Sequence, residues 1–190
     1  PFDHPLTDLR VGVANLTVNH LQLMVGPDVP LAGLRDWTAR RYPLRVPVDR
    51  VGTVDRLVFE LALEQIRLTP VALESWGGGL VPAGNYNEQL SLYRDGKVDA
   101  LWQFMGIPSP SIQEAHAARP IRPLALPPDL ITRLVQLGWS AAELPVGAYG
   151  VVTSPVPTVS MGTSLGFHAA VPTEVTFAIT AAICDNAARV

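Results

Sequence analysis

Three segments of the chain carry side chains suited to holding a small molecule, and Val51-Gly52-Thr53 is the first of them. It precedes a strongly amphipathic stretch. A helix that begins there presents unpaired N–H groups and a partial positive charge, which suit a carboxylate or a phosphate. Gly52 would let the backbone approach a ligand closely, and the Thr53 hydroxyl could donate one more hydrogen bond. An ordinary helix cap made by Thr53 explains the same residues, so both interpretations stay open.

The second segment is Trp102-Gln103-Phe104-Met105-Gly106-Ile107-Pro108, at the end of an expected strand. Two aromatic rings flank one amide, an arrangement that can supply an apolar wall and an orienting hydrogen bond. Alternation along a strand places Trp102 and Phe104 on one side and Gln103 on the other. The two rings are equally well explained as core residues.

The third segment is an apolar stretch that Asn19, His20 and Gln22 interrupt with hydrogen-bonding side chains. On a solvated edge these residues would mean little, whereas in a crossover between two lobes they would face a cleft. His20 is interpreted as a structural histidine, because no second histidine or carboxylate lies at metal-ligand spacing from it. We therefore expect no metal site.

Gly162-Thr163-Ser164-Leu165-Gly166 matches the G-x-S-x-G pattern of hydrolase nucleophile elbows. That motif needs a strand, a tight turn and an immediate helix, with an acid and then a histidine later in the chain. Here Phe167 to Val171 continues as strand and no histidine follows His168. A glycine-containing strand is the better interpretation, and an enzyme using Ser164 remains the alternative. No phosphate-binding loop or other cofactor motif is present, so no cofactor is expected.

Hydrophobic periodicity and Pro/Gly punctuation predict the elements that must position these segments. The predicted strands are 9–25, 44–48, 71–74, 98–104, 121–126 and 157–170. The predicted helices are 31–41, 53–67, 85–94, 110–119, 128–138 and 173–188. This alternation indicates an α/β fold with mostly parallel strand pairing, in which ligands bind where strands end.

The helical periods also predict which side chains are buried. In the helix from residue 53, Val54 and Leu57 are expected to face inward and Asp55 to face water. In the last helix, Val175, Ile179, Ala182 and Ile183 are expected inward. Cys184, which stands among them, is expected to be a buried small hydrophobe.

Composition excludes several classes of protein. The 190 residues are 48% hydrophobic and 16% charged, with a net charge of −3, which suits a packed core and not a disordered chain. The dispersed basic residues argue against a nucleic-acid partner, and no apolar run reaches the roughly 18 residues that a membrane span requires. The one cysteine forms no internal disulfide. Eighteen scattered prolines indicate many sharply ended elements.

Five segments taken in order resemble the TAXI-type solute receptors of TRAP transporters. Asn19 to Val25 resembles the crossover strand of that family, and Val51-Gly52-Thr53 the end of its G-x-G-T turn. Leu90 to Ala100 resembles its "aLkdGqiDA" pattern. Gly106 to Glu114 resembles its "GxPxpaixEl" turn and helix, and Pro145 to Tyr149 its "iPaGtY" loop. Asp49 and Val51 depart from the family, which has small residues there.

The resemblance implies a fold like that of type II periplasmic binding proteins, with a mixed, mostly parallel sheet flanked by helices. The family's N-terminal T-G-G-T-x-Y-P-like turn has no counterpart here, so one complete lobe plus pieces of a second is expected. Residues 1–30 would form a crossover strand and a remnant of lobe one. Residues 31–156 would form lobe two, and residues 157–190 would return to lobe one.

The function implied is capture of a small carboxylate, such as glutamate or 2-oxoglutarate, outside the cytoplasm and its delivery to membrane permease subunits. No catalysis and no membrane insertion of this chain are expected. A sensory or interaction domain derived from the receptor fold is a further alternative. The expected ligand-binding residues are Asn19, His20, Gly52, Thr53, Trp102, Gln103, Phe104, Gly106, Pro108 and Tyr149.

Overall fold

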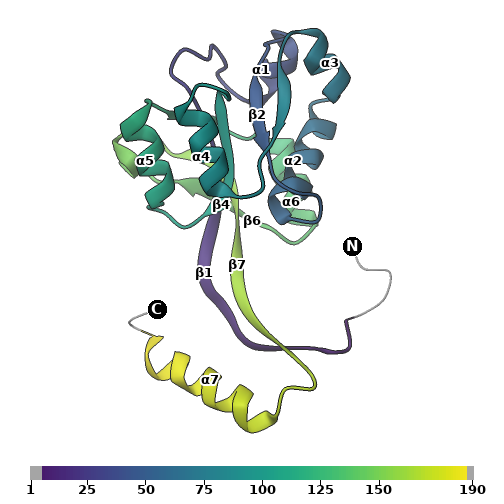
Figure 1. Cartoon of the computed structure of the whole chain (residues 1–190), viewed down its shortest axis with the longest axis vertical. Coiled ribbons are helices and arrows are strands. Elements are labelled where there is room, and N and C mark those ends of the chain that lie inside the picture. Colours follow the sequence, from purple (N-terminus) through teal and green to yellow (C-terminus); the bar gives the residue numbers. More distant parts are fainter. Residues whose placement is uncertain (1–5, 188–190) are drawn as a thin grey trace. The chain divides into compact units, whose positions relative to one another are not determined.

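A computed structural model describes residues 6–187, which divide into two compact units. Unit 1 holds the described residues up to Asn19 and from Gly162 onward, and unit 2 runs from His20 to Met161. Two long strands, β1 (Leu9–Val25) and β7 (Val156–His168), each contribute to both units (Figure 1).

The main sheet has the order β4-β1-β7-β6, and its described pairings are antiparallel. β4 (Ala100–Met105) runs against β1 with Gln22 opposite Gln103, and β6 (Ser140–Leu144) runs against β7. The short β5 (Arg122–Pro123) also pairs with β1. The expectation of mostly parallel pairing is therefore wrong. Alternation implies parallel pairing only where crossover helices join neighbouring strands, and β4 instead returns beside a strand much earlier in the chain.

One pair of strands does fit the crossover rule. β2 (Arg45–Val48) and β3 (Gly79–Pro82) are parallel and are joined by two helices, α2 (Val54–Gln65) and α3 (Pro70–Ser75). The strand expected at residues 71–74 is this second helix, because Thr69 caps it and Pro70 occupies its first turn. β3 itself is not among the predicted strands.

The remaining helices lie within their expected ranges, apart from η1, which was not predicted. They are α1 (Leu34–Ala39), α4 (Tyr86–Arg94), α5 (Pro110–Ala118), α6 (Pro128–Gln136), the short η1 (Ala148–Gly150) and α7 (Thr173–Asp185). The side chains of Thr53, Asn85 and Ser109 accept backbone N–H groups at the starts of α2, α4 and α5. Each satisfies one of the N–H groups that a helix start leaves unpaired.

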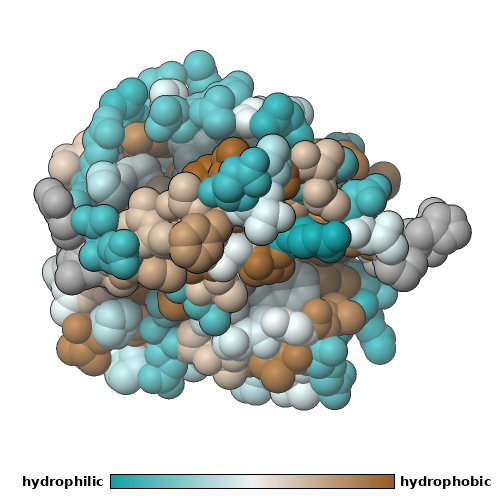
Figure 2. Space-filling model, turned by 90° about the horizontal axis from the view of Figure 1, so that it is seen from below, coloured by the Kyte–Doolittle hydropathy of each residue, from teal (hydrophilic) through white to brown (hydrophobic). Residues whose placement is uncertain are grey.

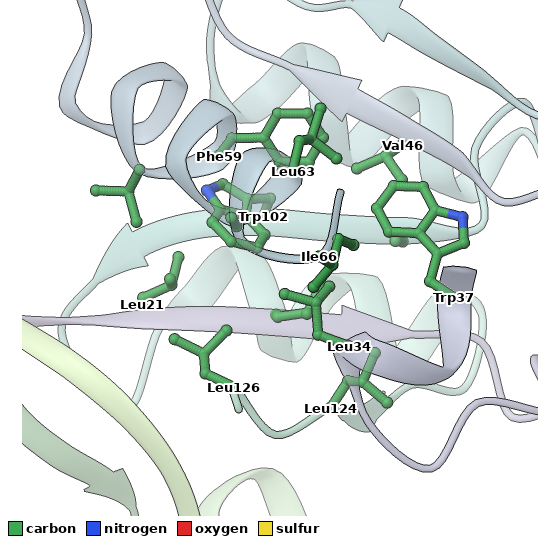
Figure 3. Close-up of a cluster of buried hydrophobic side chains, with 14 of the residues drawn as sticks. Leu21, Leu34, Trp37, Val46, Phe59, Leu63, Ile66, Trp102, Leu124 and Leu126 are labelled. Atoms are coloured by element: carbon green, nitrogen blue, oxygen red, sulfur yellow. The ribbon is translucent and has the colours of Figure 1, made fainter. Parts of the chain in front are cut away.

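Unit 2 has hydrophobic side chains packed on both faces of β1 and β4. On one face, Leu21, Trp102 and Phe104 belong to a cluster built with α1, α2 and α6 (Figure 3). The rings of Trp102 and Phe59 meet edge to face, with centroids 5.2 Å apart and planes at 80°. On the other face, Met24 belongs to a second cluster with α4 and α5.

Unit 1 is much less covered. None of the side chains of α7 is buried, and Phe177 is 72% exposed. The expectation that Val175, Ile179 and Ala182 face inward is wrong, and so is the expected burial of Cys184; Ile183 is half-buried. The helical pattern indicates an apolar face, but the described residues cover it only in part, leaving Val175 43% and Ile179 41% exposed. Figure 2 shows hydrophobic residues (brown) exposed at the surface between hydrophilic residues (teal). The end of the expected helix, Ala188, lies outside the described residues.

Candidate functional site

A cavity of about 410 Å³ lies at the carboxyl ends of the two parallel strands of unit 2. Its walls are the loop that leads from β2 into α2, the loop that leads from β3 into α4, and the first turns of those helices. The lining residues are Val48, Asp49, Arg50, Val51, Arg56, Pro82, Ala83, Gly84 and Glu88. Ligands of open α/β folds bind at the carboxyl ends of strands, so this cavity is our candidate site.

Gly52 and Thr53 border the cavity loop but are not among its lining residues. Gly52 has a φ of +93°, which lets the chain turn between Val51 and the helix. The Thr53 hydroxyl accepts the Arg56 N–H at 3.2 Å and donates to the Arg50 carbonyl at 2.9 Å. The structure therefore forms the helix cap, and the hydroxyl proton already has a partner within the protein.

Two backbone N–H groups beside the cavity are occupied by the protein's own carboxylates. The Arg50 N–H donates to Asp49 Oδ1 at 2.6 Å, and the Gly84 N–H donates to Glu88 Oε2 at 2.7 Å. A ligand carboxylate would compete with these side chains for the same donors. The loops hence offer an anion fewer free N–H groups than the sequence suggested.

The positive charge of the cavity comes from two arginines. Arg56 forms an ion pair with Glu60 at 2.7 Å on the same helix. Arg50 is exposed, and its guanidinium makes no ion pair within residues 6–187. A guanidinium binds a carboxylate through two parallel hydrogen bonds, so Arg50 is the group best suited to an acidic ligand.

A buried carboxylate precedes the lining residue Arg56 in the chain. Asp55, in the first turn of α2, is 7% exposed, and its Oδ1 accepts the Phe104 N–H at 2.9 Å. The hydroxyl oxygen of Tyr86 lies 2.9 and 3.0 Å from the two oxygens of this carboxylate and 3.1 Å from the Phe104 carbonyl. Trp102 Nε1 donates to the Asp55 carbonyl at 3.1 Å. α2, α4 and the end of β4 thus meet at one polar junction.

Burial shifts the pKa values of both members of this pair. It raises the pKa of Asp55 above its ordinary value, although the hydrogen bonds from Phe104 and Tyr86 oppose the shift. Burial and the neighbouring carboxylate also raise the pKa of Tyr86, whose hydroxyl therefore stays protonated. The negative charge of Asp49 acts on both groups in the same direction, which ties this junction electrostatically to the cavity lining.

A second polar network lies on the other face of the main sheet. The Tyr149 hydroxyl donates to Gln22 Oε1 at 2.6 Å and accepts the Ser109 N–H at 2.9 Å. The fully buried Gln22 amide donates to the carbonyls of Met105 and Gly106 at 3.1 and 3.2 Å. This network joins β1, the loop after β4, and η1. It brings Tyr149 and Gly106 together, with the exposed Pro108 in the same loop.

Other expected site residues have structural partners or remain apart. Trp102 and Phe104 are 3% and 4% exposed, which places their rings in the core and not on a cavity wall. Gln103 lies on the opposite face, where its amide donates to Gln89 at 3.4 Å. His20 is opposite Met105; its Nδ1 is buried without a partner in the described structure, and burial lowers its pKa. Asn19, in unit 1, donates to Thr163 at 2.9 Å.

Sequence reasoning missed Arg50, Arg56, Asp55 and Tyr86. The sequence held a signal for Asp55 and one for Tyr86. An acidic residue in a helix's first turn is favoured by the helix dipole even when it is buried, and Tyr86 directly follows the Asn85 cap. The loop after β3 was missed as part of the site because β3 was not among the predicted strands.

The serine motif, the metal-ligating side chains and the helix lengths can also be compared with the expectations. Ser164 lies inside β7 and not at a turn into a helix, so the nucleophile elbow is not formed there. Within residues 6–187, no three histidine, cysteine, aspartate or glutamate side chains are grouped to hold a metal ion, and no helix is both long and apolar enough to cross a bilayer.

The fold is the α/β fold of periplasmic solute-binding proteins. The chain is similar to R. palustris Rpa4515, solved with adipate (19% identity, TM-score 0.53, covering 95% of this chain and 55% of that one). It is also similar to a TctC solute binding protein from Polaromonas, solved without ligand (14% identity, TM-score 0.52, covering 98% and 58%). The chain thus spans a little over half the length of these proteins.

A family model matches the whole chain, residues 1–190, and the chain belongs to the NMT1-like family. No curated protein matches it. At these low identities the likeness to solved structures defines the fold alone.

Proposed function

We propose that this chain is the ligand-binding part of an extracytoplasmic solute receptor that presents a small carboxylate to the permease subunits of a TRAP-type transporter. The observation that supports it best is the cavity at the carboxyl ends of β2 and β3, where the guanidinium of Arg50 has no ion-pair partner within residues 6–187. Membership of the NMT1-like family and the solute-binding fold support the same class. The TAXI type is proposed from the sequence motifs.

The ligand expected at this site is a short acid of the glutamate or 2-oxoglutarate kind. Arg50 would hold its carboxylate, and Arg56 would add positive charge at the start of α2. Gly52 and Thr53 would shape the loop, and Gly106, Pro108 and Tyr149 would line the approach from β4. Asn19 and His20 would add polar contacts. Binding breaks no bond, so the receptor role needs no catalytic residue.

We also propose that the chain is arranged in parts of two lobes. Residues 31–156 would form the ligand-binding lobe, while residues 1–30 and 157–190 would belong to a second lobe of which this chain holds a part. The exposed apolar side chains of α7 support this arrangement, because an α/β lobe buries that face of a helix.

The test is ligand-induced stabilisation of the chain. Glutamate, 2-oxoglutarate, glutarate and adipate are each added, and the melting temperature is measured. An acid present at about a hundredfold excess over its Kd adds roughly 2.7 kcal/mol, which corresponds to a rise of roughly 5–10 °C for a chain of this size. We expect such a rise for at least one acid. No rise with any of them would contradict the proposal.

Matched variants then locate the site. Arg50→Gln removes the cavity arginine that has no ion-pair partner within residues 6–187 and should abolish the stabilisation. Arg40→Gln removes an exposed arginine that does not line the cavity and should leave the stabilisation unchanged. Equal effects of both variants would show that the acid binds elsewhere.

A further inference from the structure

The helices that follow the two cavity loops are joined by a pair of side chains, in addition to the backbone hydrogen bond from the Ala83 N–H to the Val48 carbonyl at 2.9 Å that joins the strand ends. Asp55 follows the Thr53 cap by two residues in α2, and Tyr86 follows the Asn85 cap by one residue in α4. Their side chains meet at 2.9 and 3.0 Å, across 31 residues of sequence. Each residue therefore holds the first turn into which one cavity loop leads.

Both residues are also attached to the same residue of β4. Phe104 gives its N–H to Asp55 at 2.9 Å, and its carbonyl oxygen lies 3.1 Å from the Tyr86 hydroxyl. Trp102 Nε1 adds a bond to the Asp55 carbonyl from the same strand. A strand whose side chains are buried is a rigid reference, so the pair fixes the starts of α2 and α4 relative to each other and to the sheet.

We propose that Asp55 and Tyr86 are positioning residues for the cavity, holding the loops at residues 49–53 and 82–85 at the separation that a ligand requires. The affinity test of this inference rests on the proposed function, whereas the hydrogen-exchange test needs no ligand. Neither residue is among those that line the cavity, so neither is expected to touch the ligand. Their role differs from that of an ordinary core bond, because the effect of breaking it should concentrate in these two loops.

The first test is amide hydrogen exchange without ligand. Tyr86→Phe removes one hydroxyl from the junction and keeps the ring. The matched control is Tyr93→Phe, which removes a hydroxyl that donates to the Pro120 carbonyl at 2.8 Å, in the second hydrophobic cluster. In Tyr86→Phe we expect roughly tenfold faster exchange at residues 49–53 and 83–85, the effect of losing a hydrogen bond to a charged group. In Tyr93→Phe the two loops should exchange as in the parent.

Asp55→Asn is the second variant, because its amide retains an acceptor for the Phe104 N–H. The single changes and the double change form a cycle, and we expect the double variant to exchange no faster than Tyr86→Phe alone. Unchanged exchange in the loops of Tyr86→Phe, or acceleration spread evenly over unit 2, would overturn the proposal. Additive effects of the two changes would overturn it as well.

The second test is affinity, measured by calorimetry with whichever acid stabilises the parent chain. Tyr86→Phe should weaken binding by roughly fivefold or more, and Tyr93→Phe by less than about twofold. Equal affinities of parent and Tyr86→Phe would overturn the positioning role. If no acid binds the parent, the proposed function fails, whereas the exchange measurement still decides whether the pair holds the loops.

Discussion

The hydroxyl of Tyr149 donates to Gln22 Oε1 at 2.6 Å, which joins η1 to the buried part of β1 across 127 residues of sequence. The same hydroxyl accepts the Ser109 N–H, so three separate segments depend on one phenolic oxygen. Burial raises the pKa of Tyr149, and the proton stays in place at neutral pH.

Tyr149→Phe should therefore destabilise the chain by about 1–3 kcal/mol, because it leaves both the Ser109 N–H and the Gln22 oxygen without this partner. The measurement is urea unfolding followed by tryptophan fluorescence. Tyr42→Phe is the control, since the Tyr42 hydroxyl makes no hydrogen bond to another described residue, and it should change the free energy of unfolding by less than about 0.5 kcal/mol. Equal losses of unfolding free energy in the two variants would mean that the hydrogen bonds of the Tyr149 hydroxyl do not stabilise the chain.

Asp99 joins the start of β4 to β2. Its carboxylate accepts Arg45 Nε at 2.9 Å, Arg45 Nη2 at 2.6 Å and the Arg45 backbone N–H at 3.0 Å. Asp99→Asn cannot satisfy all three donors, and we expect a loss of about 1.5–3 kcal/mol. The comparison is Glu114→Gln, which breaks the exposed ion pair with Arg94 and should cost less than about 1 kcal/mol. If the two losses were alike, the Asp99 pair would be no better than a surface ion pair.

Most elements could be predicted from the sequence, because hydrophobic period and Pro/Gly punctuation are local properties. The strand 9–25 and the helices after Thr53, Asn85 and Ser109 are confirmed within a few residues. Strand direction was not predictable in the same way. β4 pairs with β1 because of tertiary packing, and only the β2–β3 pair follows the crossover rule.

None of the expected ligand-binding residues is among the cavity lining, and their role in binding stays a prediction. The loop around Gly52 does border the cavity, but its polar groups are largely used within the protein. The helical period of α2 places Asp55 towards water, but the structure buries Asp55 beside Tyr86. Burial of a charged group next to its partner depends on tertiary packing. Residue spacing within one helix cannot reveal it.

The raised pKa of Asp55 predicts how stability changes with pH. In the folded chain the carboxyl binds its proton more tightly than in the unfolded chain, where the pKa is near 3.8. Stability from this group is therefore fully present below pH 3.8 and is lost as the pH rises through the folded pKa. When Asp55 is protonated it can donate to Tyr86, which frees the Tyr86 proton for the Phe104 carbonyl.

Asp55→Asn removes this titration. Urea unfolding at a series of pH values from about 4 to 7 should show that the variant gains stability relative to the parent as the pH rises. Asp49→Asn removes a neighbouring negative charge and should lower the pKa of Asp55. The loss of stability with rising pH should then occur at a lower pH in this variant than in the parent. A constant difference between Asp55→Asn and the parent over this range would contradict the prediction.

The carboxylates that occupy the loop amides predict a change in ligand preference. Glu88 holds the Gly84 N–H at 2.7 Å and places a negative charge in the cavity lining. Glu88→Gln should strengthen binding of 2-oxoglutarate by roughly three- to tenfold, because it removes a charge that repels the ligand while an amide oxygen can still accept the N–H. Binding is measured by calorimetry, with Glu64→Gln as an exposed control outside the lining. Weaker binding to Glu88→Gln would mean that Glu88 itself holds a part of the ligand.

The exposed apolar face of α7 predicts an unusual tolerance to polar substitution. Phe177 is 72% exposed, so Phe177→Ser removes little buried surface and should change the free energy of unfolding by less than about 0.5 kcal/mol. Phe59→Ser is the contrast, because Phe59 is 2% exposed and packs on Trp102; it should cost about 3–5 kcal/mol. Both are measured by urea unfolding of the same chain. A large loss for Phe177→Ser would show that another surface covers α7 in solution, and concentration dependence of that loss would identify a second copy as the cover.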